Sequence, residues 1–334
     1  MRKLGKKAEN LTLLEKSGFN VPRFVVLEDI PIGKNIFELV SEIFMMKYGT
    51  AINSNLSIRS SGTVSTPGIM KTVLDVKPNN DAVLQAFEEV RKSSKSERLK
   101  KYLKIKEVEN FSCSYIFQEM VYGNHTNESC SGALLTINPY DDRDFYFEVL
   151  FNSLGDNLMS GLVKLDEQTS IDIKLKNKVG YKNLEKLVEK LKSIFDTPQE
   201  VEFVIQDTEV FILQTRDYKV NLGKCITYTP PKDFIGQGLA VNNFSCIGLA
   251  TFYKENASEH QIIITEFTDF EDTPSMLNAA GIITLKGGRL SHAAIIANEF
   301  NLPCVVGANF QEIPKEGQQI MFDRNGTIFS RKMS

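Results

Sequence analysis

The sequence has few cysteines, and their spacing matches no redox or metal-binding motif. The five cysteines, Cys113, Cys130, Cys225, Cys246 and Cys304, form no CxxC pair and are odd in number. This pattern favours buried thiols in a reducing cytoplasm over a disulfide framework or a zinc site.

Long apolar runs are lacking as well. No stretch is long and apolar enough to span a bilayer, and the basic start, MRKLGKKAENL, has no apolar core of the kind found in signal peptides. We therefore expect a cytoplasmic protein without a membrane partner.

The chain also lacks an excess of charge of one sign. Its 39 lysines and arginines nearly balance 42 aspartates and glutamates, which leaves a formal net charge of −3 and gives no reason to expect a nucleic acid partner. The composition, 42% apolar and 24% charged, is ordinary for a globular protein. The 334 residues contain no internal repeat and suffice for two domains.

The segment GGRLSHAAIIANEFNLPCVVG, residues 287–307, is the most informative part of the sequence. Gly287 and Gly288 can take positive φ and let the backbone approach a ligand closely. Ser291 is suited to be an N-cap, so His292 would open a helix at the end where N–H groups and the dipole favour an anion. A neutral imidazole is a good nucleophile near pH 7, so this position could carry a phosphoryl group.

This segment resembles the phosphohistidine signature of the PEP-utilising enzymes, which include pyruvate phosphate dikinase, PEP synthase, PTS enzyme I and rifampin phosphotransferase. The match continues through the two alanines after His292 and the Pro-x-Val-Val-Gly exit from Pro303 to Gly307. The resemblance implies that His292 is transiently phosphorylated. Leu290 stands where the family usually has threonine, and the missing hydroxyl would affect transfer rate or acceptor choice rather than the nucleophile.

Residues before about 218 resemble, segment by segment, the nucleotide-binding domain of pyruvate phosphate dikinase, which has an ATP-grasp architecture. In the opening GKKAENLTLLEKSGFNVPRFVVL, Lys7 takes the place of the nucleotide-binding lysine, although Lys3 and Lys6 are equal candidates by position alone. In SIRSSGTVSTPGIMKTVLDV, Arg59 ends an apolar strand and offers a fork of donors for phosphate oxygens.

The loop after Arg59 is rich in serine, glycine and threonine. Its backbone N–H groups, including those at Gly62 and Thr63, would cap phosphate oxygens. The following Pro67-Gly68 turn favours the dikinase that uses inorganic phosphate over PEP synthase. Phosphate would then accept the γ-phosphoryl group, with water as the alternative.

Two further segments follow the family order. FQEMVYGN, residues 117–124, resembles the strand and connector that bind the adenine edge, which implies roles for Gln118, Met120 and Val121. Residues 132–161 repeat the family's Asn-Pro turn, its glutamate-bearing strand with Glu148, and its Gly-acid-x-x-x-x-Gly element.

The segment EVEFVIQDTEVFILQTRDYKV predicts a hairpin with metal chemistry. Glu202 and Gln214 fall on adjacent strands, where cross-strand neighbours can meet, and Mg²⁺ prefers oxygen ligands of this kind. Arg216, two residues after Gln214, would point to the same face and neutralise charge on the transferred phosphate. A purely structural hairpin would instead leave Glu200 and Glu202 solvated.

Apolar periodicity predicts alternating helices and strands. We expect helices over residues 7–17, 36–46, 183–195, 273–280 and 292–300, and a helical region that spans 81–103. We expect strands over residues 24–27, 56–59, 201–205, 210–214, 261–265, 282–284, 304–306 and 319–322, and a β-rich part from 115 to 151. With the resemblance, this pattern gives an α/β fold: an ATP-grasp domain over residues 1–218, a linker over 219–235 and a small α/β swivelling phosphohistidine domain over 236–334.

The functional expectation is an ATP-dependent, dikinase-type phosphotransferase with Mg²⁺ as cofactor. His292, Arg59 and Arg216 would be catalytic, and the resemblance implies transfer of the β-phosphoryl group with release of AMP and either pyrophosphate or phosphate. The sequence has no counterpart of the dikinase's PEP/pyruvate-binding barrel or of the inserted drug-binding domain of rifampin phosphotransferase. The acceptor therefore stays open between a separate subunit of a split dikinase and a small molecule, with a non-catalytic nucleotide sensor as a third alternative.

Overall fold

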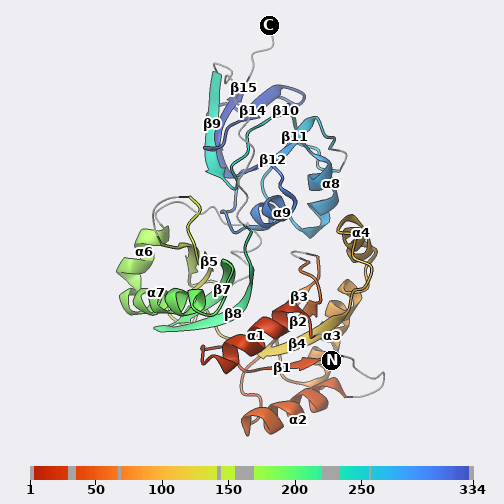
Figure 1. Ribbon diagram of the computed structural model, residues 1–334, viewed down its shortest axis with the longest axis vertical. Coiled ribbons are helices and arrows are strands. Elements are labelled where there is room, and N and C mark those ends of the chain that lie inside the picture. The colour runs from red at the N-terminus through yellow and green to blue at the C-terminus, as the bar shows by residue number, and fades with distance from the viewer. Residues whose placement is uncertain are drawn as a thin grey trace.

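The computed structural model describes residues 4–28, 35–66, 69–140, 144–154, 169–219, 233–255 and 257–330. Within these residues, the chain forms two four-stranded antiparallel sheets and a closed seven-stranded barrel. The sheets lie at one end of the molecule, and the barrel lies at the other end beside the C-terminus (Figure 1).

The first sheet has the strand order β1-β4-β2-β3 and carries helices of the N-terminal part. Its elements are α1 (Lys6–Lys16), β1 (Phe24–Leu27), α2 (Ile36–Tyr48), β2 (Leu56–Gly62), β3 (Thr72–Val76), α3 (Asn80–Ser93), α4 (Glu97–Ile105) and β4 (Cys113–Glu119). Apolar side chains of α2 and α3, such as Phe44 and Phe87, are fully buried against the sheet. The helical region predicted within 81–103 is two helices, because the Ser96 side chain caps a new helix at Leu99 N–H.

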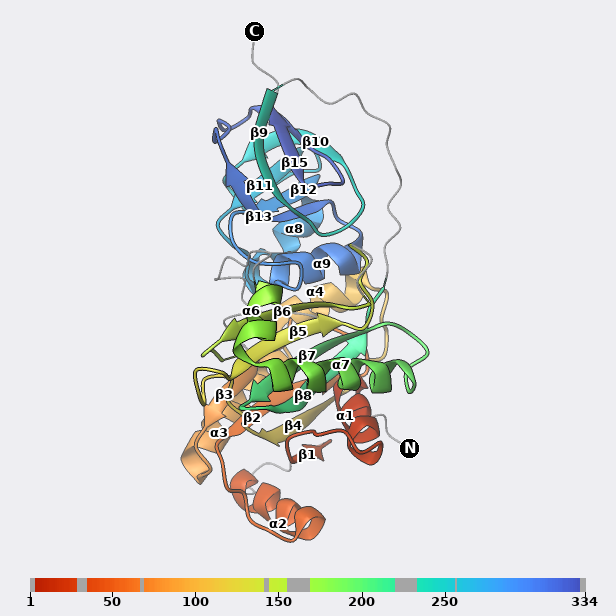
Figure 2. The same cartoon turned by 90° about the vertical axis from the view of Figure 1, so that its left-hand side faces the viewer.

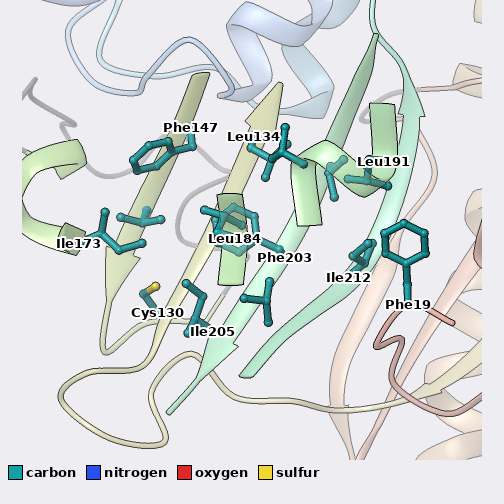
Figure 3. Packing of buried hydrophobic residues seen from close by; sticks show 14 of the residues in the cluster. Phe19, Cys130, Leu134, Phe147, Ile173, Leu184, Leu191, Phe203, Ile205 and Ile212 are labelled. Atoms are coloured by element: carbon teal, nitrogen blue, oxygen red, sulfur yellow. The ribbon is translucent and has the colours of Figure 1, made fainter. Parts of the chain in front are cut away.

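The second sheet has the order β6-β5-β7-β8 and is covered by two helices. Its elements are β5 (Cys130–Leu135), β6 (Tyr146–Phe151), α6 (Thr169–Lys176), α7 (Lys178–Lys192), β7 (Gln199–Gln206) and β8 (Glu209–Asp217). Leu184 and Leu191 of α7 pack on Phe203 and Ile212 of the hairpin, as Figure 3 shows. The predicted amphipathic face of this helix is therefore core packing. Helix α1 contacts both β8 and β2 and so joins the two sheets.

The barrel has the order β10-β11-β12-β13-β9-β15-β14. Its strands are β9 (Asp233–Ala240), β10 (Cys246–Thr251), β11 (Gln261–Thr265), β12 (Gly281–Thr284), β13 (Cys304–Phe310), β14 (Gln319–Phe322) and β15 (Thr327–Ser330), with the 3₁₀ turn η1 (Phe270–Asp272) and helices α8 (Thr273–Asn278) and α9 (His292–Phe300). Helix α9 packs on β13 and lies between the barrel and the two sheets in both views (Figures 1 and 2).

The α/β class is confirmed by this architecture. Strand β9 begins at Asp233, inside the range 219–235 predicted as a linker, so residues 233–235 belong to the barrel; residues 220–232 lie outside the described part. The division into domains stays a prediction. Four of the five cysteines are described and have free thiols, and Cys225 lies outside the described residues.

Candidate active site

A cavity of about 1010 Å³ lies between the two sheets and the part of the barrel unit that carries α9. Every residue that the sequence predicted for the site lines this cavity: Lys7, Arg59, Gly62, Thr63, Gln118, Met120, Val121, Glu202, Gln214, Arg216 and His292. The chain therefore brings together segments nearly 300 residues apart, and the candidate nucleophile shares one space with the candidate nucleotide-binding residues.

His292 is the first residue of α9 and only 4% exposed. Its Nδ1 lies 3.0 Å from the Thr268 hydroxyl. Burial, and secondly the positive charge of Arg98, lower the pKa of the imidazole to about 4. The side chain is therefore neutral near pH 7, as a nucleophilic histidine requires. Ser291 occupies the N-cap position as predicted, but its side chain makes no capping hydrogen bond.

The loop before α9 follows the prediction at one glycine and departs from it at the other. Gly287 has φ 93°, in the left-handed region that favours glycine. Gly288 does not have a left-handed φ. A Cβ there would lie 2.3 Å from Oε1 of Glu148, so a larger residue would displace this carboxylate.

Glu148 of β6 holds the loop that precedes His292 against the second sheet. Its Oε1 accepts the N–H of Arg289 at 2.6 Å and the Tyr146 hydroxyl at 2.7 Å, and its Oε2 accepts the N–H of Leu290 at 3.1 Å. Burial raises the pKa of this carboxyl, while these three donors counteract the shift. The sequence predicted Glu148 only as a strand residue, because no local pattern indicates a contact with Arg289, 141 residues further along the chain.

Helix α4 makes a second contact between the two halves of the molecule, the sheets with their helices (residues 4–219) and the barrel with its helices (residues 233–330). Lys106, just after α4, pairs with Glu299 of α9 at 2.7 Å and lies over the ring of Phe300 at 4.1 Å. Tyr102 meets the same ring edge-on, with the centroids 5.6 Å apart. Helix α9 also lines the cavity, with His292, Ile295 and Glu299 among its lining residues.

Two basic side chains enter the cavity from the first sheet and α1. Arg59 is 5% exposed and donates from Nη2 to Ser57 Oγ at 2.9 Å. Burial, and secondly Arg59, lower the pKa of Lys7 to about 8. Gly5 sets the position of Lys7: it has φ 87°, and a Cβ there would lie 2.2 Å from the Ser61 carbonyl oxygen. Of the three lysines considered, Lys6 lines the cavity but is exposed, and Lys3 lies outside the described residues.

The loop after Arg59 differs in part from the prediction. The N–H of Thr63 donates to the Ser112 carbonyl at 3.0 Å, so it is already used within the protein and does not point to a phosphate site. The reason is that the loop continues the pairing of β2 with β4 for one more residue. The Pro67-Gly68 turn and the Gly155–Gly161 element lie outside the described residues.

The hairpin of β7 and β8 places its polar residues as predicted. Glu202 stands directly opposite Gln214, and the Gln214 amide donates to the Glu202 carboxylate. The Gln214 carbonyl oxygen is buried and accepts no hydrogen bond from any described residue. Beside this pair, Nη2 of Arg216 donates to both carboxylate oxygens of Glu200 at 2.7 Å. Glu200 is 7% exposed, so the solvated arrangement of a purely structural hairpin does not occur.

The end of β4 forms the wall opposite the hairpin. The Met120 N–H is used by the Asn55 carbonyl at 2.9 Å, whereas Val121 makes no backbone hydrogen bond to any described residue. The Gln118 side chain is 1% exposed and donates to Pro22 O at 3.4 Å, and its Oε1 likewise has no partner in the described part of the chain.

Within the described ranges, no helix combines the length and apolar character needed to cross a membrane. The same ranges contain no group of three or more His, Cys, Asp or Glu side chains arranged to hold a metal ion.

Comparison with known families agrees with this geometry. Residues 2–179 match the family described as pyruvate phosphate dikinase, AMP/ATP-binding domain, and residues 257–325 match the PEP-utilising enzyme, mobile domain. The two sheets around one cavity, followed by a small unit with a histidine at a helix N-terminus, agree with the order of these two matches. The chain belongs to the pyruvate phosphate dikinase family.

Two curated relatives illustrate the extent of the similarity. The chain is 25% identical over 287 residues to pyruvate, phosphate dikinase of Rickettsia typhi. The alignment covers 73% of this chain and 33% of the relative. It is 29% identical over 275 residues to pyruvate, phosphate dikinase 2 of Zea mays. That alignment covers 68% of this chain and 30% of the relative. The chain thus spans about a third of the length of these relatives.

Among solved structures, a RimK domain protein ATP-grasp from Sphaerobacter thermophilus aligns with a TM-score of 0.33 and 12% identity. The alignment covers 64% of this chain and 58% of that chain. A similarity of this size supports no inference about function.

Proposed function

We propose that this chain is an ATP-dependent phosphotransferase in which His292 accepts a phosphoryl group from ATP bound in the cavity. The observation that carries the proposal is the shared cavity: a buried, neutral imidazole faces the same space as Lys7, Arg59 and Arg216. Three basic side chains in one cleft suit a polyphosphate, and the matched family is described as binding AMP and ATP.

The proposed step uses Nε2 of His292, since Nδ1 is hydrogen-bonded to Thr268. When Nδ1 carries the proton, Nε2 carries the lone pair that attacks phosphorus. By the family resemblance this is the β-phosphorus. A P–N bond forms, the bond to the AMP oxygen breaks and AMP leaves with its electron pair. The γ-phosphoryl group then passes to phosphate, which gives pyrophosphate, or to water, which gives phosphate.

Glu202 and Gln214 would hold Mg²⁺. The fit rests on the Glu202 carboxylate and on the buried Gln214 carbonyl oxygen, two oxygen ligands that stand opposite each other on the hairpin. Bound there, the ion would supply positive charge against the phosphates. Arg59 and Arg216 would add charge from the protein, and catalysis would consist mainly of positioning and charge neutralisation.

The adenine would lie along the end of β4. Val121 would provide backbone hydrogen bonds, because its N–H is not used by any described residue, and Gln118 and Met120 would line the same wall. Gly62 and Thr63 would line the phosphate site at the end of β2, without a hydrogen bond from the Thr63 N–H, which the Ser112 carbonyl accepts. Lys7 would neutralise phosphate charge at the opening of α1.

The final acceptor is a small molecule or a site on a separate subunit. Residues 1–218 would act as the nucleotide-binding domain and residues 236–334 as the carrier that takes the phosphoryl group to that acceptor. Mass spectrometry of the protein after incubation with ATP and Mg²⁺, with and without phosphate, tests the proposal. A gain of one phosphoryl group on the peptide containing His292, together with AMP, supports it; unmodified protein that converts no ATP contradicts it.

A further inference from the structure

We propose that Leu290 docks the histidine unit (residues 233–330) on the nucleotide half (residues 4–219) through apolar contacts. This docking positions His292 for phosphorylation. The inference rests on the proposed function, because it assigns Leu290 a positioning role in that reaction. It is carried by contacts across the two halves of the molecule.

Leu290 is 1% exposed, yet its side chain is not part of the barrel core. It belongs to a small apolar cluster whose other buried members are Ala133 and Leu135 of β5 and Tyr218. The partly buried residues packed around this cluster also come from the nucleotide half: Ile137, Tyr140, Tyr146 and Leu150. A buried side chain of the histidine unit thus packs against the other half.

The neighbouring contacts fix the direction of this side chain. The Arg289 guanidinium lies over the Tyr140 ring at 3.8 Å and donates from Nε to the Ala240 carbonyl of β9 at 2.9 Å. The Leu290 N–H donates to Glu148. A substitution at residue 290 keeps this backbone hydrogen bond and changes the apolar contact alone, so the two contributions can be separated.

Docking has opposite effects on the two stages of a carrier reaction. His292 must lie at the cavity to be phosphorylated and must leave it to reach an acceptor outside. Burial of a leucine side chain favours association by an amount equivalent to at least a tenfold change in the docking equilibrium. Leu290 therefore favours phosphorylation and opposes departure. Threonine, which the resembled motif has at this position, would bury less apolar surface and weaken docking.

The test compares Leu290→Thr, Leu290→Asp and Leu290→Met in the full chain. Small-angle X-ray scattering measures compactness, and single-turnover incubation with radiolabelled ATP and Mg²⁺ measures phosphorylation. We expect Leu290→Thr to slow phosphorylation at least tenfold. Leu290→Asp would place a carboxylate beside Glu148 and should give both a larger radius of gyration and a greater loss of rate. Leu290→Met keeps the apolar volume and should therefore have the wild-type radius of gyration and the wild-type phosphorylation rate.

Leu302→Thr is the matched control, because it makes the same kind of change at a leucine that packs within the histidine unit. Leu302 packs against the buried cluster that includes Ile296 and Ala297 of α9. The control substitution should lower thermal stability while leaving the radius of gyration unchanged below the melting transition. The proposal is overturned if folded Leu290→Asp protein scatters and is phosphorylated like the wild type. Scattering does not depend on chemistry, so expansion of Leu290→Asp in a protein that is never phosphorylated would uphold docking and reject the proposed function.

Discussion

Oε2 of Glu148 accepts the backbone N–H of Leu290 at 3.1 Å, although 142 positions separate the two residues in the sequence. The bond joins β6 of the second sheet to the loop that precedes His292. Because the same carboxylate also accepts the Arg289 N–H, it fixes two consecutive peptide groups just ahead of the candidate nucleophile.

Glu148→Ala is expected to slow phosphorylation of His292 by about tenfold to a hundredfold. The change removes charge-assisted hydrogen bonds and leaves the partly buried Arg289 N–H and the buried Leu290 N–H without their acceptor. Single-turnover labelling with ATP measures the effect, and Glu128→Ala, at an exposed position, serves as the control. An unchanged rate in Glu148→Ala would show that this contact does not position the histidine.

The pH dependence of phosphorylation should show no protonation of His292 between pH 8 and pH 5.5. Burial lowers its pKa to about 4, whereas an imidazole with an ordinary pKa near 6.5 would lose about 90% of its neutral form by pH 5.5. NMR titration of the ring, assigned with His292→Asn, measures the pKa directly. A value near 6.5 would contradict the buried, neutral nucleophile.

The same shift links stability to pH. Between about pH 6.5 and pH 4 the unfolded chain binds a proton at His292 that the folded chain does not, so folding stability falls as the pH falls through this window. Denaturant unfolding of the wild type should therefore lose more stability in this window than His292→Asn. The expected extra loss is about 3 kcal/mol in total.

ATP binding near pH 8 should be accompanied by proton uptake at Lys7. The free protein holds this ammonium about half protonated, since its pKa is about 8, and bound phosphates favour the charged form. Affinity should accordingly fall as the pH rises from 8 to 9. Calorimetry in two buffers of different ionisation enthalpy measures the uptake, which Lys7→Met should abolish and Lys6→Met should retain. Equal uptake in the wild type and Lys7→Met would reject the assignment.

Glu202→Gln is expected to raise the Mg²⁺ concentration required for phosphorylation at least tenfold. The substitution keeps the size of the side chain and one acceptor oxygen but replaces the other oxygen by an amide NH₂ and removes the charge that attracts the ion. Glu209→Gln, at the exposed start of β8 in the same hairpin, should leave the requirement unchanged. If both variants show the wild-type Mg²⁺ dependence, the ion binds elsewhere.

The sequence could predict those parts of the site that follow from local periodicity. The hairpin pattern placed Glu202 and Gln214 on adjacent strands and Arg216 on the same face, and the resemblance to the family assigned the roles of these residues and of His292. Helix α9 and strands β1, β11 and β14 have the expected bounds. These elements depend on residues close together in the chain.

Features that depend on distant contacts were missed. Nothing in the local sequence of Glu148 or Gly288 indicates that they meet across the two halves. Strands β9, β10 and β15 were also missed: β9 has the sequence DFIGQGLA, in which two glycines interrupt the alternation of apolar residues. Their pairing is determined by closure of the barrel, which places β9 between β13 and β15.

The central claim is that His292 carries the β-phosphoryl group of ATP. Parallel incubations with ATP labelled at the β- or the γ-phosphorus, followed by isolation of the protein under alkaline conditions, test it most directly. The account predicts label on the protein from β-labelled ATP, release of that label by acid, formation of AMP, and no label on His292→Asn. Stable label on the protein from γ-labelled but not from β-labelled ATP, or label on His292→Asn to the wild-type extent, would contradict the account.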